Sequence, residues 1–116
     1  MIDLAINVSE NNDWQVITLK GELDDYQSVK LTDTFNRLID ESHVKDIILN
    51  LDEVSFVDSV GLGTIAIAGK KLLQKTGHLH IVCSQQKIAK MVTMSGIISA
   101  TKDTIQIFES FEDATN

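Results

Sequence analysis

The chain has 116 residues, of which 43% are hydrophobic, and a formal net charge of −7 from 17 acidic and 10 basic side chains. This length and apolar share predict one domain with its own core, and the acidic balance argues against a nucleic-acid-binding surface and against docking on a membrane of anionic lipid. We expect a cytoplasmic protein, because no apolar run reaches the about 18 residues of a membrane span, no signal peptide precedes the first strand, and a lone cysteine, Cys83, fits a reducing compartment.

The first third of the chain predicts a β-hairpin followed by a helix. Residues 4–8 and 14–20 alternate between apolar and polar side chains, and a polar turn cluster separates them, which is typical of two antiparallel strands. Asp24 or Asp25 is placed to cap the helix that follows. We expect this helix to end near residues 40–42, and its apolar face to comprise Val29, Leu31, Phe35, Leu38 and Ile39.

The middle of the chain predicts a buried strand that leads into a long helix. The apolar run at 47–51 is rich in β-branched residues, as in a strand covered on both faces. Helical spacing then extends from about Ser59 to Thr76, and Gly77 occupies the usual position after a helix. Ser59 is expected to be the N-cap of this helix, with its hydroxyl near solvent. It is either a structural cap or a hydroxyl that is chemically modified.

The last third predicts a strand at 78–83, a short helix around residues 88–92 that ends at Ser95-Gly96, a strand at 105–108 and a terminal helical turn. The resulting order is β-β-α-β-α-β-α-β. Strands that alternate with helices after an opening hairpin predict an α/β fold. We expect a mixed, mostly parallel sheet of about five strands, packed by three to four helices.

The sequence offers no convincing catalytic or metal site. His43, His78 and His80 are predicted to lie away from Ser59, so no nucleophile–base set is expected. His78 and His80 share one strand face, but no third ligand is evident, whereas tight metal sites need three or four. We therefore expect neither an enzyme nor a bound cofactor.

Nucleotide binding is the remaining chemical alternative. The segment 61–66 matches G-x-G-x-x-A between a strand and a helix. The acidic residue expected about twenty positions later is missing, and Asp58 would face the phosphate. The other interpretation is that Gly61 and Gly63 provide a tight turn and close packing of helix against sheet. A phosphoaspartate receiver is disfavoured, because the opening hairpin breaks its strict strand–helix alternation.

Three segments resemble a known family, namely Gly21-Glu22-Leu23-Asp24, the stretch from Leu49 to Gly63, and Met94-Ser95-Gly96-Ile97. They are similar to the STAS domain, and more narrowly to the bacterial anti-sigma factor antagonists of the RsbV/SpoIIAA type. The resemblance covers nearly the whole chain and implies one STAS domain over residues 1–116. In that family the serine of the D-S-x-G segment is phosphorylated by the anti-sigma factor, a serine kinase, which implies phosphorylation of Ser59.

The resemblance also implies a function and a surface. The unphosphorylated form would bind the serine-kinase anti-sigma factor, which carries the ATP, and release sigma, and a serine phosphatase would reset Ser59. The partner-binding surface would comprise Asp24, Asp58, Val60, Gly61 and Leu62, of which the two acids would repel a phosphate. Val60 departs from the family, which often has a second hydroxyl there. A structural STAS subunit of a larger assembly, for example in lipid transport, is the alternative.

Overall fold

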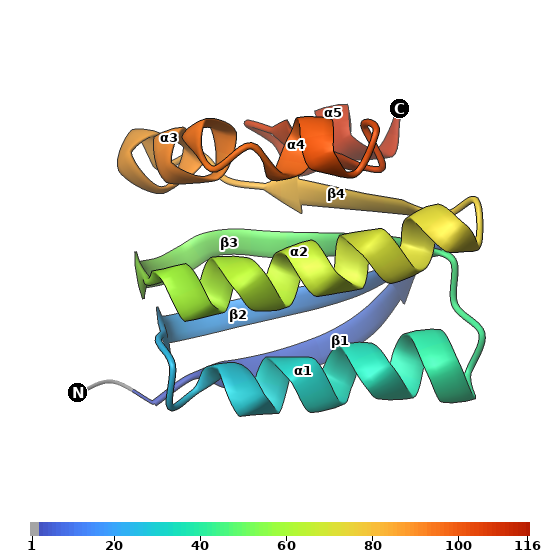
Figure 1. Ribbon diagram of the computed structural model, residues 1–116, viewed down its shortest axis with the longest axis horizontal. Coiled ribbons are helices and arrows are strands. Elements are labelled where there is room, and N and C mark those ends of the chain that lie inside the picture. Colours follow the sequence, from blue (N-terminus) through green and yellow to red (C-terminus); the bar gives the residue numbers. More distant parts are fainter. Residues whose placement is uncertain (1–2) are drawn as a thin grey trace.

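The computed structural model describes residues 3–116 and shows a five-stranded sheet in the order β1-β2-β3-β4-β5 (Figure 1). The strands are β1 (Ala5–Asn11), β2 (Trp14–Leu23), β3 (Asp46–Val57), β4 (His78–Val82) and β5 (Ile105–Phe108). β1 pairs antiparallel with β2, and every other neighbouring pair is parallel. The predicted mostly parallel sheet with an antiparallel edge is confirmed.

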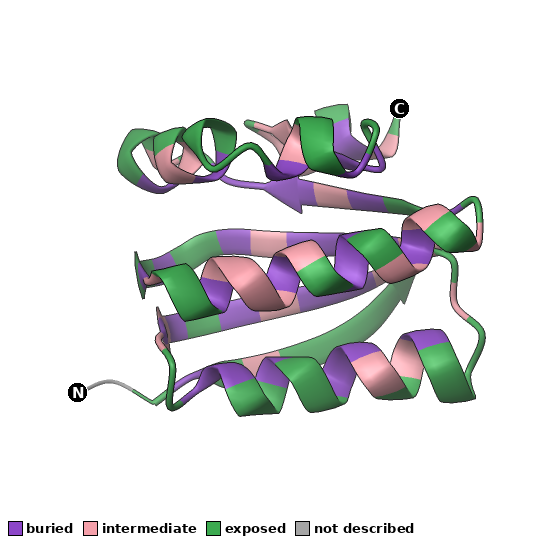
Figure 2. Ribbon diagram, in the orientation of Figure 1, coloured by how far each residue is buried: buried purple, intermediate pink, exposed green. Residues whose placement is uncertain are grey.

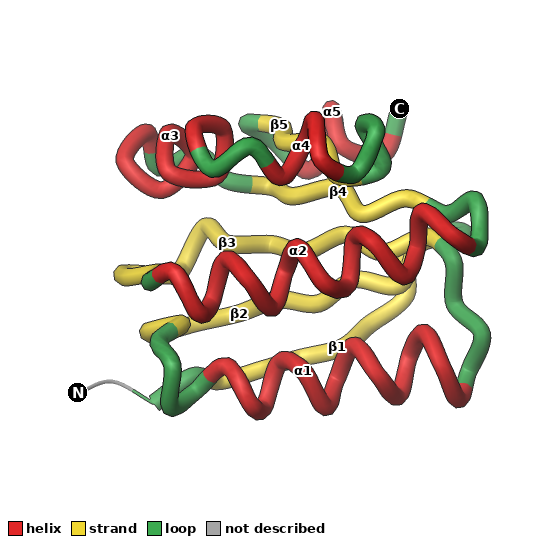
Figure 3. Tube along the Cα trace, viewed as in Figure 1, coloured by secondary structure: helices red, strands yellow, loops and turns green. Residues whose placement is uncertain are grey.

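The helices are α1 (Ser28–Asn36), which continues as a π-helical turn η1 (Arg37–Glu41), α2 (Ser59–Gln74), α3 (Gln86–Met94), α4 (Ile97–Ala100) and α5 (Phe111–Thr115). Parallel strands that follow one another in chain order, joined by right-handed crossovers, place every crossover helix on the same face of the sheet. Accordingly, α1 to α4 lie on one face (Figure 3).

The main core fills the space between this helical layer and the sheet. Helices α1 to α4 each contribute buried residues, which are purple in Figure 2. Its fully buried members include Ile17, Leu49, Ile65, Leu72 and Ile81. The opposite face of the sheet carries only a small cluster, in which Ala114 of α5 packs against Val16, Ile48 and Val82. Along β1, the alternate residues on this opposite face are exposed and mostly polar.

The turns explain where the predicted boundaries were inaccurate. β1 continues to Asn11, beyond the predicted end at residue 8, because the hairpin needs only a two-residue turn, Asn12-Asp13. Asn12 adopts φ 54°, a left-handed conformation that asparagine tolerates. After α2, the left-handed residue is Thr76 at φ 57°, not Gly77. Gly77 is required for another reason: a Cβ there would collide with the Lys45 carbonyl oxygen.

β3 is longer than its apolar run and brings the chain to the edge of the sheet where the parallel strands end. Its pairing with β2 shifts register after Thr18, where the Asn50 side chain accepts a hydrogen bond from the Asp52 N–H at 2.9 Å. The Gln85 amide donates to the carbonyl oxygens of Leu51, Asp52 and Val54 at 3.3, 3.1 and 2.6 Å. This side chain supports the irregular part of β3, so that Leu23 and Val57 still pair at the strand ends.

Candidate functional site

The turn between β3 and α2 is built on Asp58. This residue has an extended backbone, with φ −102° and ψ −178°, and its Oδ1 accepts a hydrogen bond from the Gly61 N–H at 2.8 Å. Asp58 is therefore the N-cap of α2, and the prediction that Ser59 caps this helix is wrong. Aspartate and serine are both preferred caps. The helix begins one position earlier than a Ser59 cap would require, so Ser59 is the first helical residue.

Ser59 is exposed at the start of α2. Among residues 3–116, none forms a hydrogen bond with its hydroxyl. The N–H groups of Gly61 and Leu62 are occupied by the side chain and the carbonyl oxygen of Asp58, at 2.8 and 3.0 Å. The hydroxyl thus faces solvent at the positive end of the helix dipole, a place that favours negative charge.

The predicted acids Asp24 and Asp58 follow strand ends that pair directly, because Leu23 lies opposite Val57. The Asp58 N–H donates to the Leu23 carbonyl oxygen at 3.2 Å. Asp24 Oδ1 accepts from the Gln27 N–H at 2.8 Å and so closes the turn before α1. The N-cap of α1 is Gln27, without a side-chain cap, so the prediction that Asp24 or Asp25 caps this helix is wrong. Both carboxylates are thus held by main-chain N–H groups, a structural role that was not expected for Asp58.

The other predicted surface residues differ in exposure. Val60 is 48% exposed and Leu62 is half-buried against the core. Gly61 is buried, and a Cβ there would lie 2.7 Å from the Leu23 carbonyl oxygen, so glycine permits the close approach of α2 to β2. Gly63 has no such neighbour within 4 Å. Both glycines lie inside α2, not in a phosphate-binding loop, which removes the geometric basis of the dinucleotide motif.

Sequence reasoning missed several apolar side chains at this end of the molecule. Tyr26 is 74% exposed and Phe56 is 48% exposed. Val29 was expected on the buried face of the first helix and is 61% exposed, which corrects that prediction. No local signal marks these positions, because an apolar residue at helical or strand spacing is ordinarily assigned to the core.

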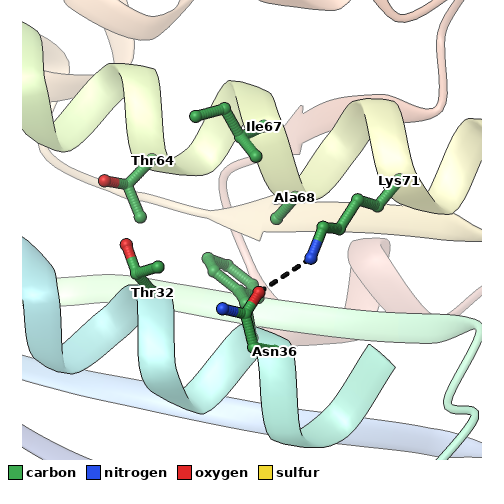
Figure 4. Close-up of a pocket in the computed structure, with 7 residues that line it drawn as sticks. Thr32, Asn36, Thr64, Ile67, Ala68 and Lys71 are labelled. Carbon is green, nitrogen blue, oxygen red and sulfur yellow. Dashed lines mark hydrogen bonds between the residues drawn. The ribbon is translucent and has the colours of Figure 1, made fainter. Parts of the chain in front are cut away.

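A shallow pocket of about 30 Å³ lies between α1 and α2 (Figure 4). Lys71 closes one end, where its Nζ lies 2.8 Å from both Asn36 Oδ1 and Asp40 Oδ2. The hydrogen bond from Lys71 lowers the pKa of the Asp40 carboxyl group. The volume is far below the about 300 Å³ of a typical small-molecule site.

The histidines lie away from Ser59, at the opposite end of the parallel strands. His78 pairs with Asp46, the first residue of β3, and its Nδ1 lies 2.9 Å from the Asp46 carboxylate. His80 Nδ1 lies 2.7 Å from the Ala114 carbonyl oxygen. Within the described part of the chain, no group of three or more His, Cys, Asp or Glu side chains is arranged to hold a metal ion. None of the helices between residues 3 and 116 is long and apolar enough to cross a membrane.

Comparisons with known proteins by sequence and by structure point to the same kind of protein. The anti-sigma-B factor antagonist of Staphylococcus aureus is 27% identical over 111 residues, which are 96% of this chain and 98% of the relative. An anti-sigma factor antagonist from Mycobacterium paratuberculosis has a similar solved structure, with a TM-score of 0.83, 21% identity, and coverage of 97% of this chain and 92% of that one. The Bacillus cell fate determinant SpoIIAA in its phosphorylated form gives a TM-score of 0.72 and 23% identity, with 96% of each chain covered. The profile of the STAS domain family matches residues 5–114, and the chain therefore belongs to this family.

Proposed function

We propose that this chain is an anti-sigma factor antagonist whose binding is switched by phosphorylation of Ser59. It acts in the cytoplasm as a regulatory binding protein and not as an enzyme. In the unphosphorylated form it binds a serine-kinase anti-sigma factor and thereby frees sigma. The kinase supplies the ATP, and a serine phosphatase restores the unmodified form. The name of the Staphylococcus aureus relative, which aligns over 98% of its length, supports this assignment.

The observation that carries the proposal is the position of Ser59. An exposed hydroxyl without an internal hydrogen bond is available to a kinase, and the Asp58 cap holds it on a rigid turn. Val60 carries no hydroxyl, so Ser59 is the one acceptor at the start of α2. We therefore expect a single phosphate at this turn.

A phosphate on Ser59 would weaken docking through charge and bulk. It adds about −1.5 to −2 charges and three acceptor oxygens. Asp24 and Asp58 already place negative charge beside the turn, and Val60 and Leu62 offer the apolar contact that a partner would cover. A partner surface that tolerates two carboxylates and a neutral serine would meet a strongly anionic group instead. The helix N-terminus can hold this group without rearrangement of the fold.

The test is to incubate the protein with its cognate kinase and ATP, locate any added phosphate by mass spectrometry, and measure binding of both forms to the kinase. Ser59→Ala removes the acceptor, and Ser99→Ala, on the exposed side of α4, is the matched control. We expect one phosphate in the control and none in Ser59→Ala. Binding of the phosphorylated form as tight as that of the unmodified form contradicts the switch, and lack of phosphorylation by any cognate kinase favours a structural STAS subunit.

A further inference from the structure

The exposed side of α2 carries two apolar side chains beyond Ser59. Val60 and Ile67 are 48% and 60% exposed, and residues seven apart lie on the same side of a helix. Ile67 borders the pocket between α1 and α2, whose floor includes Phe35 and Ala68. Figure 4 shows Thr64 on α2 facing α1 across this pocket, with Ile67 on the α2 side of it. The name α1–α2 groove is used below for this pocket and its border.

We propose that the α1–α2 groove is a second contact for the same kinase that acts on Ser59, and that it receives an uncharged apolar side chain of the kinase. This inference rests on the proposed function. It adds a docking point on the helices, separate from the phosphorylated turn, that would contribute to affinity and not to the transfer of phosphate.

The distance between the two points identifies the occupant. Ser59 and Ile67 are eight positions apart on one helix, which corresponds to roughly 12 Å along its axis. A specific interface covers about 800 Å² on each partner, a patch roughly 30 Å across. A kinase that takes up Ser59 from the helical side of the molecule therefore covers the groove as well. The exposed Val60 lies beside Ser59 on the same side of the helix as Ile67, and Thr64 separates the two apolar side chains.

The charged side chains around the groove are of mixed sign. The exposed acid Asp33 lies on α1, and the exposed cation Lys70 lies on α2, three positions after Ile67. Lys71 is engaged by Asp40 and Asn36, so its charge and that of Asp40 offset each other. An uncharged apolar side chain is complementary to such a surface, because neither sign of charge dominates there.

The experiment compares Ile67→Glu with Gln74→Glu, two turns further along the same exposed side of α2. Each variant adds one negative charge at an exposed position of one helix. We expect Ile67→Glu to weaken binding of the unphosphorylated protein to the kinase at least tenfold, and Gln74→Glu to change it less than threefold. In steady-state phosphorylation, Ile67→Glu should raise KM and leave kcat within twofold, because the groove does not touch the reacting hydroxyl. Thermal unfolding verifies that both variants fold, and Ile67→Ala replaces Ile67→Glu if that variant does not.

The outcomes separate this inference from the proposed function. If the unmodified protein neither binds a cognate kinase nor is phosphorylated, the proposed function fails. If it binds and is phosphorylated, but Ile67→Glu binds as tightly as Gln74→Glu, the groove is not a kinase contact. Sedimentation of the free protein adds a third result: a dimer that Ile67→Glu dissociates, with unchanged kinase binding, assigns the groove to a second copy of this chain and overturns the inference.

Discussion

Asp58 Oδ2 accepts a hydrogen bond of 2.9 Å from the main-chain N–H of Asp25, a residue 33 positions earlier in the chain. The second carboxylate oxygen, Oδ1, accepts from the Gly61 N–H at 2.8 Å. One side chain therefore joins the β2–α1 turn to the first turn of α2. The orientation of Ser59 depends on both hydrogen bonds.

Replacement of Asp58 should destabilise the fold. Asp58→Ala removes a helix cap and a second charge-assisted hydrogen bond, so we expect the free energy of unfolding to fall by about 2 kcal/mol in urea denaturation. Asp58→Asn keeps a preferred cap and should lose less. Asp33→Ala, at an exposed position inside α1, is the control and should stay within about 0.5 kcal/mol of the original protein. Equal stability of Asp58→Ala and Asp33→Ala would show that the two hydrogen bonds contribute nothing.

The two glycines of α2 should respond in opposite directions. In Gly61→Ala the new Cβ would lie 2.7 Å from the Leu23 carbonyl oxygen, and we expect a loss of about 1–3 kcal/mol, as in other overpacked sites. Gly63→Ala meets nothing within 4 Å and should gain up to about 1 kcal/mol from helix propensity. The midpoints of thermal unfolding of the two variants test this difference. A midpoint for Gly61→Ala at or above that of Gly63→Ala contradicts the close packing of α2 on β2.

Stability should decrease in mild acid because of His80. Its ring lies 4.6 Å from that of Trp14 and 4.8 Å from that of Phe108, measured between centroids. Burial lowers the pKa of His80, and the positive charge of His78 acts in the same direction, while the Ala114 carbonyl oxygen and Asp46 oppose the shift. The unfolded chain then binds the proton more readily than the folded protein. The contribution of neutral His80 is complete above about pH 6.5 and is lost as the pH falls toward its lowered pKa.

Thermal unfolding between pH 7.5 and pH 5 tests the effect of His80. We expect His80→Gln to show a shallower loss of stability over this range than the original protein. His43→Gln, at an exposed position, is the control. If the slopes of His80→Gln and the original protein coincide, the pH dependence arises elsewhere.

Gln85 should contribute more to the free energy of unfolding than its half-buried position suggests. In Gln85→Ala three carbonyl oxygens of β3 lose a donor, and we expect the free energy of unfolding to fall by about 1–3 kcal/mol. Gln85→Glu should cost more, because a carboxylate would face the same oxygens. Gln86→Glu, one position later in the first turn of α3, should be neutral or slightly stabilising. Chemical denaturation of the three variants tests this order, and a neutral Gln85→Glu would contradict the role of the amide.

Much of the fold could be predicted, because its signals are local. The period-two pattern of residues 14–20 and the apolar run at 47–51 identify β2 and β3, and helical spacing identifies α2. α4 was not predicted, since a helix of four residues has no periodicity and depends on the left-handed Gly96 at φ 83°. The placement of α1 to α4 on one face of the sheet depends on the order of the strands, and local sequence patterns do not reveal this order.

The site could be predicted in part. The placement of Ser59 at the start of a helix follows from local spacing, and the proximity of Asp24 and Asp58 follows from the expected pairing of their strands. The choice of Asp58 over Ser59 as the cap could not be made, because the two side chains are nearly equivalent there. The exposure of Val29 and Ile67 also could not be predicted, since it depends on how far α1 and α2 stand apart.

The face of the sheet opposite α1 to α4 offers a site for a label with which binding can be measured. Asn7 is exposed in β1 on the surface turned away from the helical layer, and Cys83 is buried, with a thiol whose pKa is raised by burial. A cysteine introduced by Asn7→Cys would therefore react with a maleimide dye while Cys83 stays protected. The fluorophore would report on complex formation from behind the sheet, without obstructing a partner that approaches α1 and α2.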